Sequence, residues 1–214
     1  MVGVEPGGGA VSAAPEQGYG PPGAPRRPAI GPHTVEDWLA LNPTADGSRV
    51  ELILGHIHVS PAPSGEHQLA AFTLALAIRE AVRAAGRSDL HVVPAVNVRI
   101  STAFRTALIP DVVVLTRPPV GVSFPAEALA LAVEIWSPGN PRVERELKML
   151  GYAGAGVPFF WAVDQSSELS EPRLTAYRLD EGLYREEDVL KPGTEAPITA
   201  SPVPFRLDIS DLAV

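Results

Sequence analysis

The sequence of 214 residues contains no cysteine. This absence excludes disulfides, zinc sites built on thiolates and cysteine nucleophiles, and it is typical of a reducing compartment, so we expect a cytoplasmic location. No run of 18 or more apolar residues is present, although a helix needs about that length to cross a bilayer. The N-terminus also lacks a basic region followed by an apolar stretch, so we expect neither a secretory signal nor a membrane partner.

Basic residues are the second shortage. The chain has 17 Lys and Arg against 25 Asp and Glu, which gives a net charge of −8. Proteins that bind nucleic acid usually gain affinity by neutralising phosphates with Lys and Arg, so this charge argues against tight, non-specific coating of DNA. A local basic groove, or a site whose carboxylates are masked by a bound metal, stays compatible with it.

Large apolar residues are almost absent from residues 1–32, which hold 15 Gly or Pro. Such a segment cannot bury enough surface to offset the entropy lost on ordering. We therefore predict a disordered tail over residues 1–32 and one domain over residues 33–214. The two acidic and two basic residues of the tail cancel, so the whole charge of −8 belongs to the domain.

The rest of the sequence alternates between helical and strand patterns. Caps at Thr34 and Ser64 predict helix starts. The second of these helices is expected to have a wide apolar face, formed by Leu69, Phe72, Leu74, Leu76, Ile78 and Val82. The predicted helices span residues 35–41, 65–85 and 142–153. The predicted strands span residues 50–54, 56–60, 91–100, 109–115, 129–136, 157–163, 174–179 and 183–187. This order predicts an α/β domain of the α+β kind, with a mixed β-sheet flanked by helices and a β-hairpin added at each end.

Two of the strands that are expected to be buried carry one carboxylate each. Asp111 lies in the strand 109–115 and Glu134 in the strand 129–136, and both strands are almost continuously apolar. An ionised carboxylate is costly to bury, and two close together repel each other. A divalent cation between them removes both costs, and magnesium prefers one or two carboxylates completed by water and substrate phosphate. Asp111 and Glu134 are therefore predicted ligands of Mg²⁺, with Mn²⁺ as an alternative.

A lysine is predicted to join these two carboxylates. Lys148 and Glu144 are four residues apart on the helix 142–153, so they share a face, which Tyr152 continues. This helix directly follows the strand of Glu134, so a short connection can fold it onto the sheet. Lys148 would then stabilise charge that develops on a phosphoryl group, and the implied reaction is metal-assisted hydrolysis of a phosphodiester.

Together these motifs resemble the Uma-two family of putative restriction endonucleases, which belongs to the PD-(D/E)XK nuclease superfamily. The residues that carry the likeness are 50–55, His67, 109–114, 133–138, 144–148, Tyr152 and 156–164. The likeness extends roughly from Thr34 to the C-terminus. It implies a restriction-endonuclease-like core and magnesium-dependent cleavage of DNA.

Two positions depart from the usual pattern. The lysine of the superfamily usually stands two residues after the glutamate, where this sequence has Trp136. As in the family that it resembles, the sequence offers the lysine from the helix, at Lys148. The acid four residues before that lysine is usually Asp in the family, and here it is Glu144, whose extra methylene keeps the charge but changes the reach.

Three further residues are candidates for the site. Glu51 matches the family's early glutamate and would add a metal ligand or orient a water, unless it is a charge on a hairpin face. His67 would contact a phosphate or orient a carboxylate, or it is a histidine satisfied near its helix cap. Arg105 precedes Asp111 and would steer a phosphate backbone, or it is a solvated loop charge. Glu51 and Glu144 rank as catalytic candidates, and His67 and Arg105 as substrate contacts.

Three functions stay open at this point. The first is an endonuclease acting on DNA, for which a homodimer would suit cleavage of two strands. The second is a non-catalytic module with the same fold that binds a protein partner or regulates one, which the charge of −8 favours and the pair of buried carboxylates disfavours. The third is cleavage of RNA or of a small phosphodiester.

Overall fold

The larger of the two main β-sheets carries the predicted buried strands. The computed structural model describes residues 29–137, 139–165 and 171–212. The strands of this sheet are β3 (His91–Pro94), β6 (Val112–Leu115), β8 (Leu129–Trp136), β9 (Phe159–Asp164), β10 (Arg173–Asp180) and β11 (Leu183–Leu190). Their order is β11-β10-β9-β8-β6-β3, in which β8 and β9 run parallel and the other neighbours run antiparallel. The predicted mixed sheet of an α+β fold is confirmed.

A second sheet lies beside the first. Its strands are β1 (Arg49–Ile53), β2 (His56–Ser60), β4 (Asn97–Ser101), β5 (Thr106–Leu108) and β7 (Ser123–Pro125), in the order β2-β1-β5-β4-β7. The predicted N-terminal hairpin therefore belongs to this second sheet, whereas the C-terminal hairpin β10–β11 extends the larger one. A small further pair, β12 (Ala196–Ile198) and β13 (Phe205–Leu207), was not predicted.

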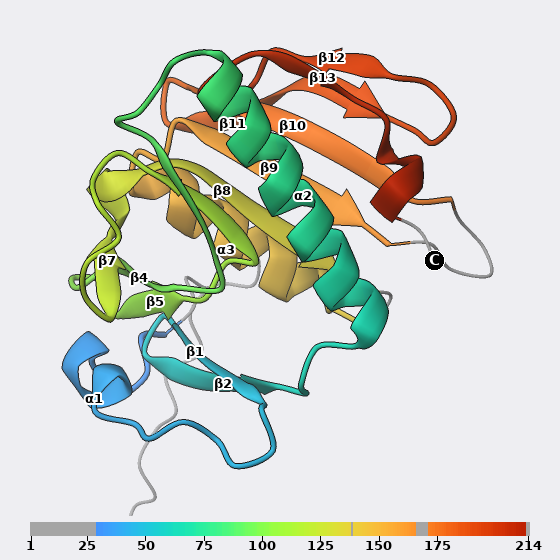
Figure 1. Ribbon diagram of the computed structural model, residues 1–214. Coiled ribbons are helices and arrows are strands. Elements are labelled where there is room, and N and C mark those ends of the chain that lie inside the picture. The colour runs from blue at the N-terminus through green and yellow to red at the C-terminus, as the bar shows by residue number, and fades with distance from the viewer. Residues whose placement is uncertain (1–28, 138, 166–170, 213–214) are drawn as a thin grey trace, which may run out of the picture.

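Two helices cover the larger sheet on opposite faces. Helix α2 (Gly65–Ala84) crosses one face, and helix α3 (Arg142–Gly154) lies behind the other (Figure 1). Side chains alternate along β6: Val112 and Val114 share a cluster with α2, and Val113 packs in the cluster that includes α3. Helix α1 (Val35–Leu39) begins at the predicted cap, Thr34, which forms a capping box with Asp37, and it ends two residues before the predicted end at residue 41. Two 3-10 turns, η1 (Ala126–Ala128) and η2 (Ile209–Leu212), complete the described elements.

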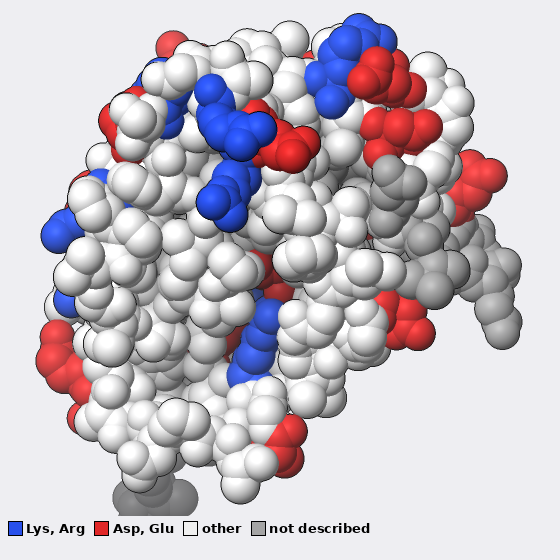
Figure 2. Space-filling model, viewed as in Figure 1, with Lys and Arg blue, Asp and Glu red and all other residues white. Residues whose placement is uncertain are grey.

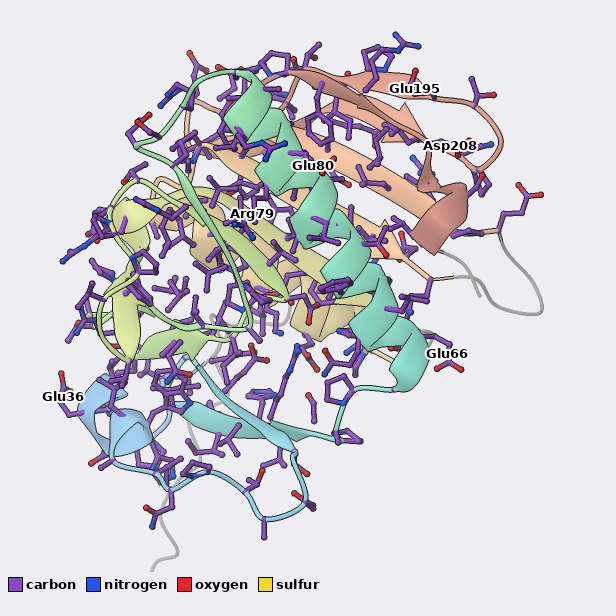
Figure 3. The ribbon with its side chains drawn as sticks, in the orientation of Figure 1. Glu36, Glu66, Arg79, Glu80, Glu195 and Asp208 are labelled. Atoms are coloured by element: carbon purple, nitrogen blue, oxygen red, sulfur yellow. The ribbon has the colours of Figure 1, made fainter. Side chains whose placement is uncertain are left out.

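The prediction of the buried face of α2 was partly wrong. Leu69, Phe72 and Leu76 are 45%, 61% and 43% exposed. The other three predicted residues, Leu74, Ile78 and Val82, are buried as expected, together with His67, Ala70 and Ala71. Apolar residues surround most of this helix, so periodicity alone could not choose the inward side; the two alanines suit close approach to the sheet. On the outer surface, Figure 3 shows Glu66 near the start of α2 and Glu80 in its second half.

The predicted strand 91–100 is divided into β3 and β4, and the predicted strand 109–115 begins only at Val112. Both interruptions lie beside Asp111. At Ala95 the backbone turns with a φ of 46°, which separates β3 from β4 and sends them into different sheets. Residues 109–111 likewise cross from β5 of one sheet to β6 of the other. The amide of Ala95 donates to the carbonyl of Asp111 at 3.1 Å, so the two crossings are tied together beside the predicted carboxylate.

The chain enters the domain against the β1–β2 turn. Residues 1–28 of the predicted tail lie outside the described residues, but Gly31 is buried, and its amide donates to the carbonyl of Leu54 at 2.7 Å. Arg105 donates to the carbonyl of Gly31 at 2.8 Å. Packing of the domain therefore begins before residue 33. Within the described segments, no helix is long and apolar enough to cross a membrane.

Candidate active site

Asp111 is held at the junction of the two sheets. Its amide donates to the carbonyl of Val133 at 3.0 Å, and its Oδ2 accepts from the amide of Ile135 at 2.7 Å. These two bonds attach Asp111 to Val133 and Ile135, the residues immediately before and after Glu134 in β8. The crossing of the chain between the sheets therefore brings the two predicted carboxylates to the same end of β8.

The second oxygen of Asp111 receives two side chains. Its Oδ1 contacts Nη1 of Arg49, from the start of β1, and Nε2 of His67, from the first turn of α2, at 2.7 Å. Burial acts to raise the pKa of Asp111, but the contacts with His67 and Arg49 hold it below its ordinary value. The carboxylate is therefore ionised, and because it only accepts hydrogen bonds, Nε2 of His67 carries the hydrogen.

Glu134 is buried among groups of both charges. Its Oε1 accepts from the hydroxyl of Tyr152 at 2.8 Å, and its Oε2 lies 3.5 Å from Nζ of Lys148. Burial raises the pKa of Glu134 to about 8; Lys148 opposes the rise, and Glu51 and Asp111 add to it. Without a further cation, this carboxyl therefore keeps its proton at neutral pH.

Lys148 lies among three carboxyl groups. Its Nζ is 2.6 Å from Glu51 Oε2, 3.5 Å from Glu134 Oε2 and 3.9 Å from Glu144 Oε1. Burial lowers the pKa of Lys148, but these acids outweigh burial and raise it above its ordinary value, so the ammonium stays charged. It also lies 5.6 Å from the centre of the Trp136 ring. Trp136, at the usual place of the superfamily lysine, thus packs against the lysine that comes from the helix.

Glu51 links Lys148 to the strand junction. One of its oxygens pairs with Lys148, and Oε1 accepts from the amide of Ile109 at 2.7 Å. Ile109 begins the crossing segment that ends at Asp111. Of the two readings left open for Glu51, the solvated hairpin charge does not agree with this geometry, because Glu51 is 3% exposed.

These side chains line a cavity of about 520 Å³. Four carboxyl groups and two basic side chains face it: Glu51, Asp111, Glu134 and Glu144 against Arg49 and Lys148. When all four carboxyl groups are ionised, the cavity has an excess of two negative charges. Residues 61–64, which follow β2, form part of its wall, and so do Ser137, Gly139, Asn140 and Pro141, which lie between β8 and α3. Figure 2 shows acidic and basic atoms at the bottom of a recess between α2 and the β1–β2 hairpin, with mostly uncharged surface around it.

The donor set of the cavity suits a hard cation. The excess of two carboxylates matches one divalent charge, and carboxylate oxygens are the ligands that magnesium prefers. Among the described residues, however, no three acidic or histidine side chains stand together as a preformed ligand group. The residues therefore fit an ion that takes two carboxylates from the protein and completes its shell with water and substrate oxygens.

Not every predicted residue lies at the cavity. Asp111, Glu134, Lys148, Glu51, Glu144 and His67 line it. Arg105 does not: its guanidinium donates to the carbonyls of Gly31 and Pro32, so the prediction of a substrate contact is not supported by its position. The sequence reasoning missed Arg49. The signal was its spacing, because residues two apart on a strand point to the same side, and Arg49 stands two before Glu51.

The comparisons with known proteins agree with this geometry. The family model Uma2, described as "Putative restriction endonuclease", matches residues 35–210. The chain therefore belongs to this family, as its motifs predicted. A comparison with curated proteins found no match.

A solved structure shares the fold. It is the crystal structure of a putative nuclease belonging to DUF820 from Anabaena variabilis, with a TM-score of 0.66 and 21% sequence identity. The match covers 85% of this chain and 97% of that one. At this identity the likeness speaks for the fold, and it confirms the predicted fold class.

Proposed function

We propose that this chain is a metal-dependent endonuclease that hydrolyses phosphodiester bonds of DNA, with Asp111 and Glu134 as ligands of Mg²⁺ or Mn²⁺. The observation that carries the proposal is the cluster of Lys148 with buried carboxyl groups, at 2.6 Å from Glu51 and 3.5 Å from Glu134, in one cavity with Asp111. A fold has no structural need for so many like charges in its interior, since each is costly to bury. The family description supports the nuclease class.

The ion would lower the pKa of a water and neutralise charge on the phosphate. Asp111 is ionised and therefore carries the charge that a cation needs, and Glu134 becomes a ligand when it loses its proton. Lys148 is charged and its Nζ lies 3.5 Å from Glu134, so it can stabilise the negative charge that develops on the phosphoryl oxygens as phosphorus becomes five-coordinate. Glu51 and Glu144 position Lys148, and Glu51 does so through its bond to the segment before Asp111.

A non-catalytic module that binds a protein is the second candidate. The observation in its favour is the net charge of −8, together with the largely uncharged rim in Figure 2. Cleavage of RNA or of a small phosphodiester would use the same groups. DNA is preferred because the family is described as restriction endonucleases, and a homodimer would suit cleavage of both strands.

The proposal is tested by incubating the protein with plasmid DNA, single-stranded DNA and RNA, in Mg²⁺, in Mn²⁺ and in EDTA. We expect cleavage of DNA only with a metal present. Lys148→Ala should lower the rate roughly a hundredfold or more, because it removes a charge that acts in the transition state. Asp111→Asn should lower it at least as much, because the amide is a poor ligand for a hard cation.

The sequence offers a matched control. Its other lysine is Lys191, which is exposed after β11, so Lys191→Ala should leave cleavage unchanged. If no nucleic acid is cut with either metal, or if Lys148→Ala and Lys191→Ala behave alike, the enzymatic proposal is rejected in favour of the binding module.

A further inference from the structure

Arg49 is the basic side chain of the cavity with the fewest acidic partners. Lys148 has three carboxyl groups within 3.9 Å, so its charge is already shared among them. Arg49 pairs with one carboxylate among the described residues, that of Asp111. A guanidinium has five N–H donors in a planar fork, so this contact leaves most of its donors unused. Arg49 therefore has more hydrogen-bond donors than the carboxylate of Asp111 can accept from.

Arg49 is also the more exposed of the two side chains that contact Asp111. The amide of Ile135 belongs to β8, and His67 is fixed by the first turn of α2. The Arg49 side chain is 18% exposed against 9% for His67, and it lies on the wall of the cavity. A cation that binds Oδ1 of Asp111 would meet the positive guanidinium there, so Arg49 is the group that has to leave.

We propose that Arg49 is a phosphate-binding residue. Arg49 pairs with Asp111 when the cavity holds no cation, and it pairs with a phosphate group of the ligand when Asp111 binds a cation. The fork of the guanidinium matches two phosphate oxygens, as it matches a carboxylate. Arg49 comes from β1 and Lys148 comes from α3, so a phosphate that bound between them would be held from two sides of the cavity. The identities of cation and substrate rest on the proposed function, but the exchange of Arg49 between Asp111 and phosphate does not.

The exchange is tested in EDTA with inorganic phosphate as the probe, so that neither metal nor cleavage is needed. Phosphate affinity is measured by titration calorimetry for the wild type, Asp111→Asn, Arg49→Gln and the double variant. Asp111→Asn should bind phosphate roughly tenfold more tightly, because it releases Arg49 from a charge-assisted contact. In the Arg49→Gln background the same change should have little effect, and the difference between the two is the coupling.

The double variant separates this mechanism from a general effect of charge. Removing the negative charge of Asp111 would favour any anion, but that gain would persist without Arg49. If Asp111→Asn gives the same gain with and without Arg49, or gives none, the proposal is overturned. Arg49→Lys is a second variant in case Arg49→Gln does not fold: it keeps the charge and loses the fork, so the coupling should fall but not vanish.

A second arginine–aspartate pair supplies the control. Arg145 lies 2.7 Å from Asp164, and neither residue lines the cavity. Asp164→Asn should leave phosphate affinity unchanged. A further readout is Mn²⁺ affinity, which should rise in Arg49→Gln because its competitor for Asp111 is removed. Intact coupling without any cleavage would reject the nuclease and keep the phosphate site, whereas cleavage without coupling would reject the phosphate site alone.

Discussion

Each carboxylate of the cavity owes its state to its immediate neighbours. Asp111 accepts hydrogen bonds at both oxygens, so its pKa is lowered although it is buried. Glu134 has the Tyr152 hydroxyl and a more distant Lys148, so burial prevails and its pKa is raised to about 8. Two carboxyl groups, one directly before β6 and one in the neighbouring strand β8, thus differ in protonation at neutral pH, which the sequence pattern alone could not indicate.

The raised pKa of Glu134 predicts a pH dependence of stability. The unfolded chain loses this proton near the ordinary value of 4.5, whereas the folded protein keeps it to about pH 8. Between these values the folded state binds more protons, so Glu134 makes the free energy of unfolding fall as pH rises, by up to about 1.4 kcal/mol per pH unit. Its contribution is greatest at low pH and is lost as pH passes through the folded pKa.

Glu134→Gln removes this titration and keeps the size of the side chain. In EDTA, we expect wild type and variant to differ little in stability at about pH 5, and the variant to become the more stable of the two by about pH 8. Urea denaturation at several pH values measures the difference. A difference that is constant across this range would mean that Glu134 is ionised throughout in the folded protein.

At the scale of elements, the β1–β2 hairpin carries Arg49 and Glu51 into the cavity. The turn of the hairpin is held from outside: the amide of Gly55 donates to the carbonyl of Arg105 at 2.7 Å, and the carbonyl of Gly55 accepts from the amide of His33 at 3.1 Å. Gly55 has a φ of 75°, and a Cβ there would lie 2.4 Å from the carbonyl oxygen of Gly31. The conformation and the close approach both require glycine.

Gly55→Ala should therefore destabilise the protein in two ways. The left-handed backbone costs about 1–2 kcal/mol for a residue with a Cβ, and the contact with Gly31 adds about 1–3 kcal/mol of overpacking. Gly86→Ala is the matched control, because Gly86 has a φ of 69° but open space around its Cβ position. The difference between the denaturant midpoints of the two variants measures the cost of the contact with Gly31. Equal losses would show that the chain at Gly31 yields without cost.

At the scale of the whole molecule, the net negative charge and the small number of basic residues at the cavity disfavour tight binding of a long nucleic acid. The net charge is −8, and among the residues that line the cavity only Arg49 and Lys148 are basic. Figure 2 shows that most of the surface around the recess carries no charged side chains on that face. Affinity for a substrate should therefore come from the few groups inside the cavity more than from contacts along a phosphate backbone.

This distribution predicts a weak dependence of DNA binding on salt. The logarithm of the binding constant falls with the logarithm of salt concentration by roughly 0.9 for each phosphate contact in duplex DNA. With two basic side chains in the cavity, we expect a slope no steeper than about −2 for the wild type, with cleavage blocked by omitting metal. Lys148→Ala keeps only Arg49 of this pair, so its slope should be no steeper than about −1 under the same conditions. Fluorescence anisotropy at several salt concentrations measures it, and a slope several times steeper would reveal a further basic surface.

Much of this protein could be predicted from the sequence because local patterns carry it. Caps at Thr34 and Ser64 mark the helix starts, and β8 has the predicted bounds, since continuous apolar character marks a strand that is covered on both faces. The cost of burying Asp111 and Glu134 indicated that they share a site, and the spacing of Glu144 and Lys148 placed a cation near it. These inferences need only neighbours along the chain or the expense of an isolated charge.

Only the tertiary structure decided which side of α2 is buried, where residues 91–100 break between two sheets, and which cation reaches Asp111. Each depends on contacts between segments far apart in the sequence: Arg49 meets Asp111 from 62 positions away, and Arg105 turns instead to the backbone of Gly31. Periodicity describes one element at a time, so it cannot rank two apolar faces of a helix or choose between two arginines. The first choice is made by the packing of α2 on the larger sheet, and the second by the junction of the two sheets, where β1 brings Arg49 to Asp111.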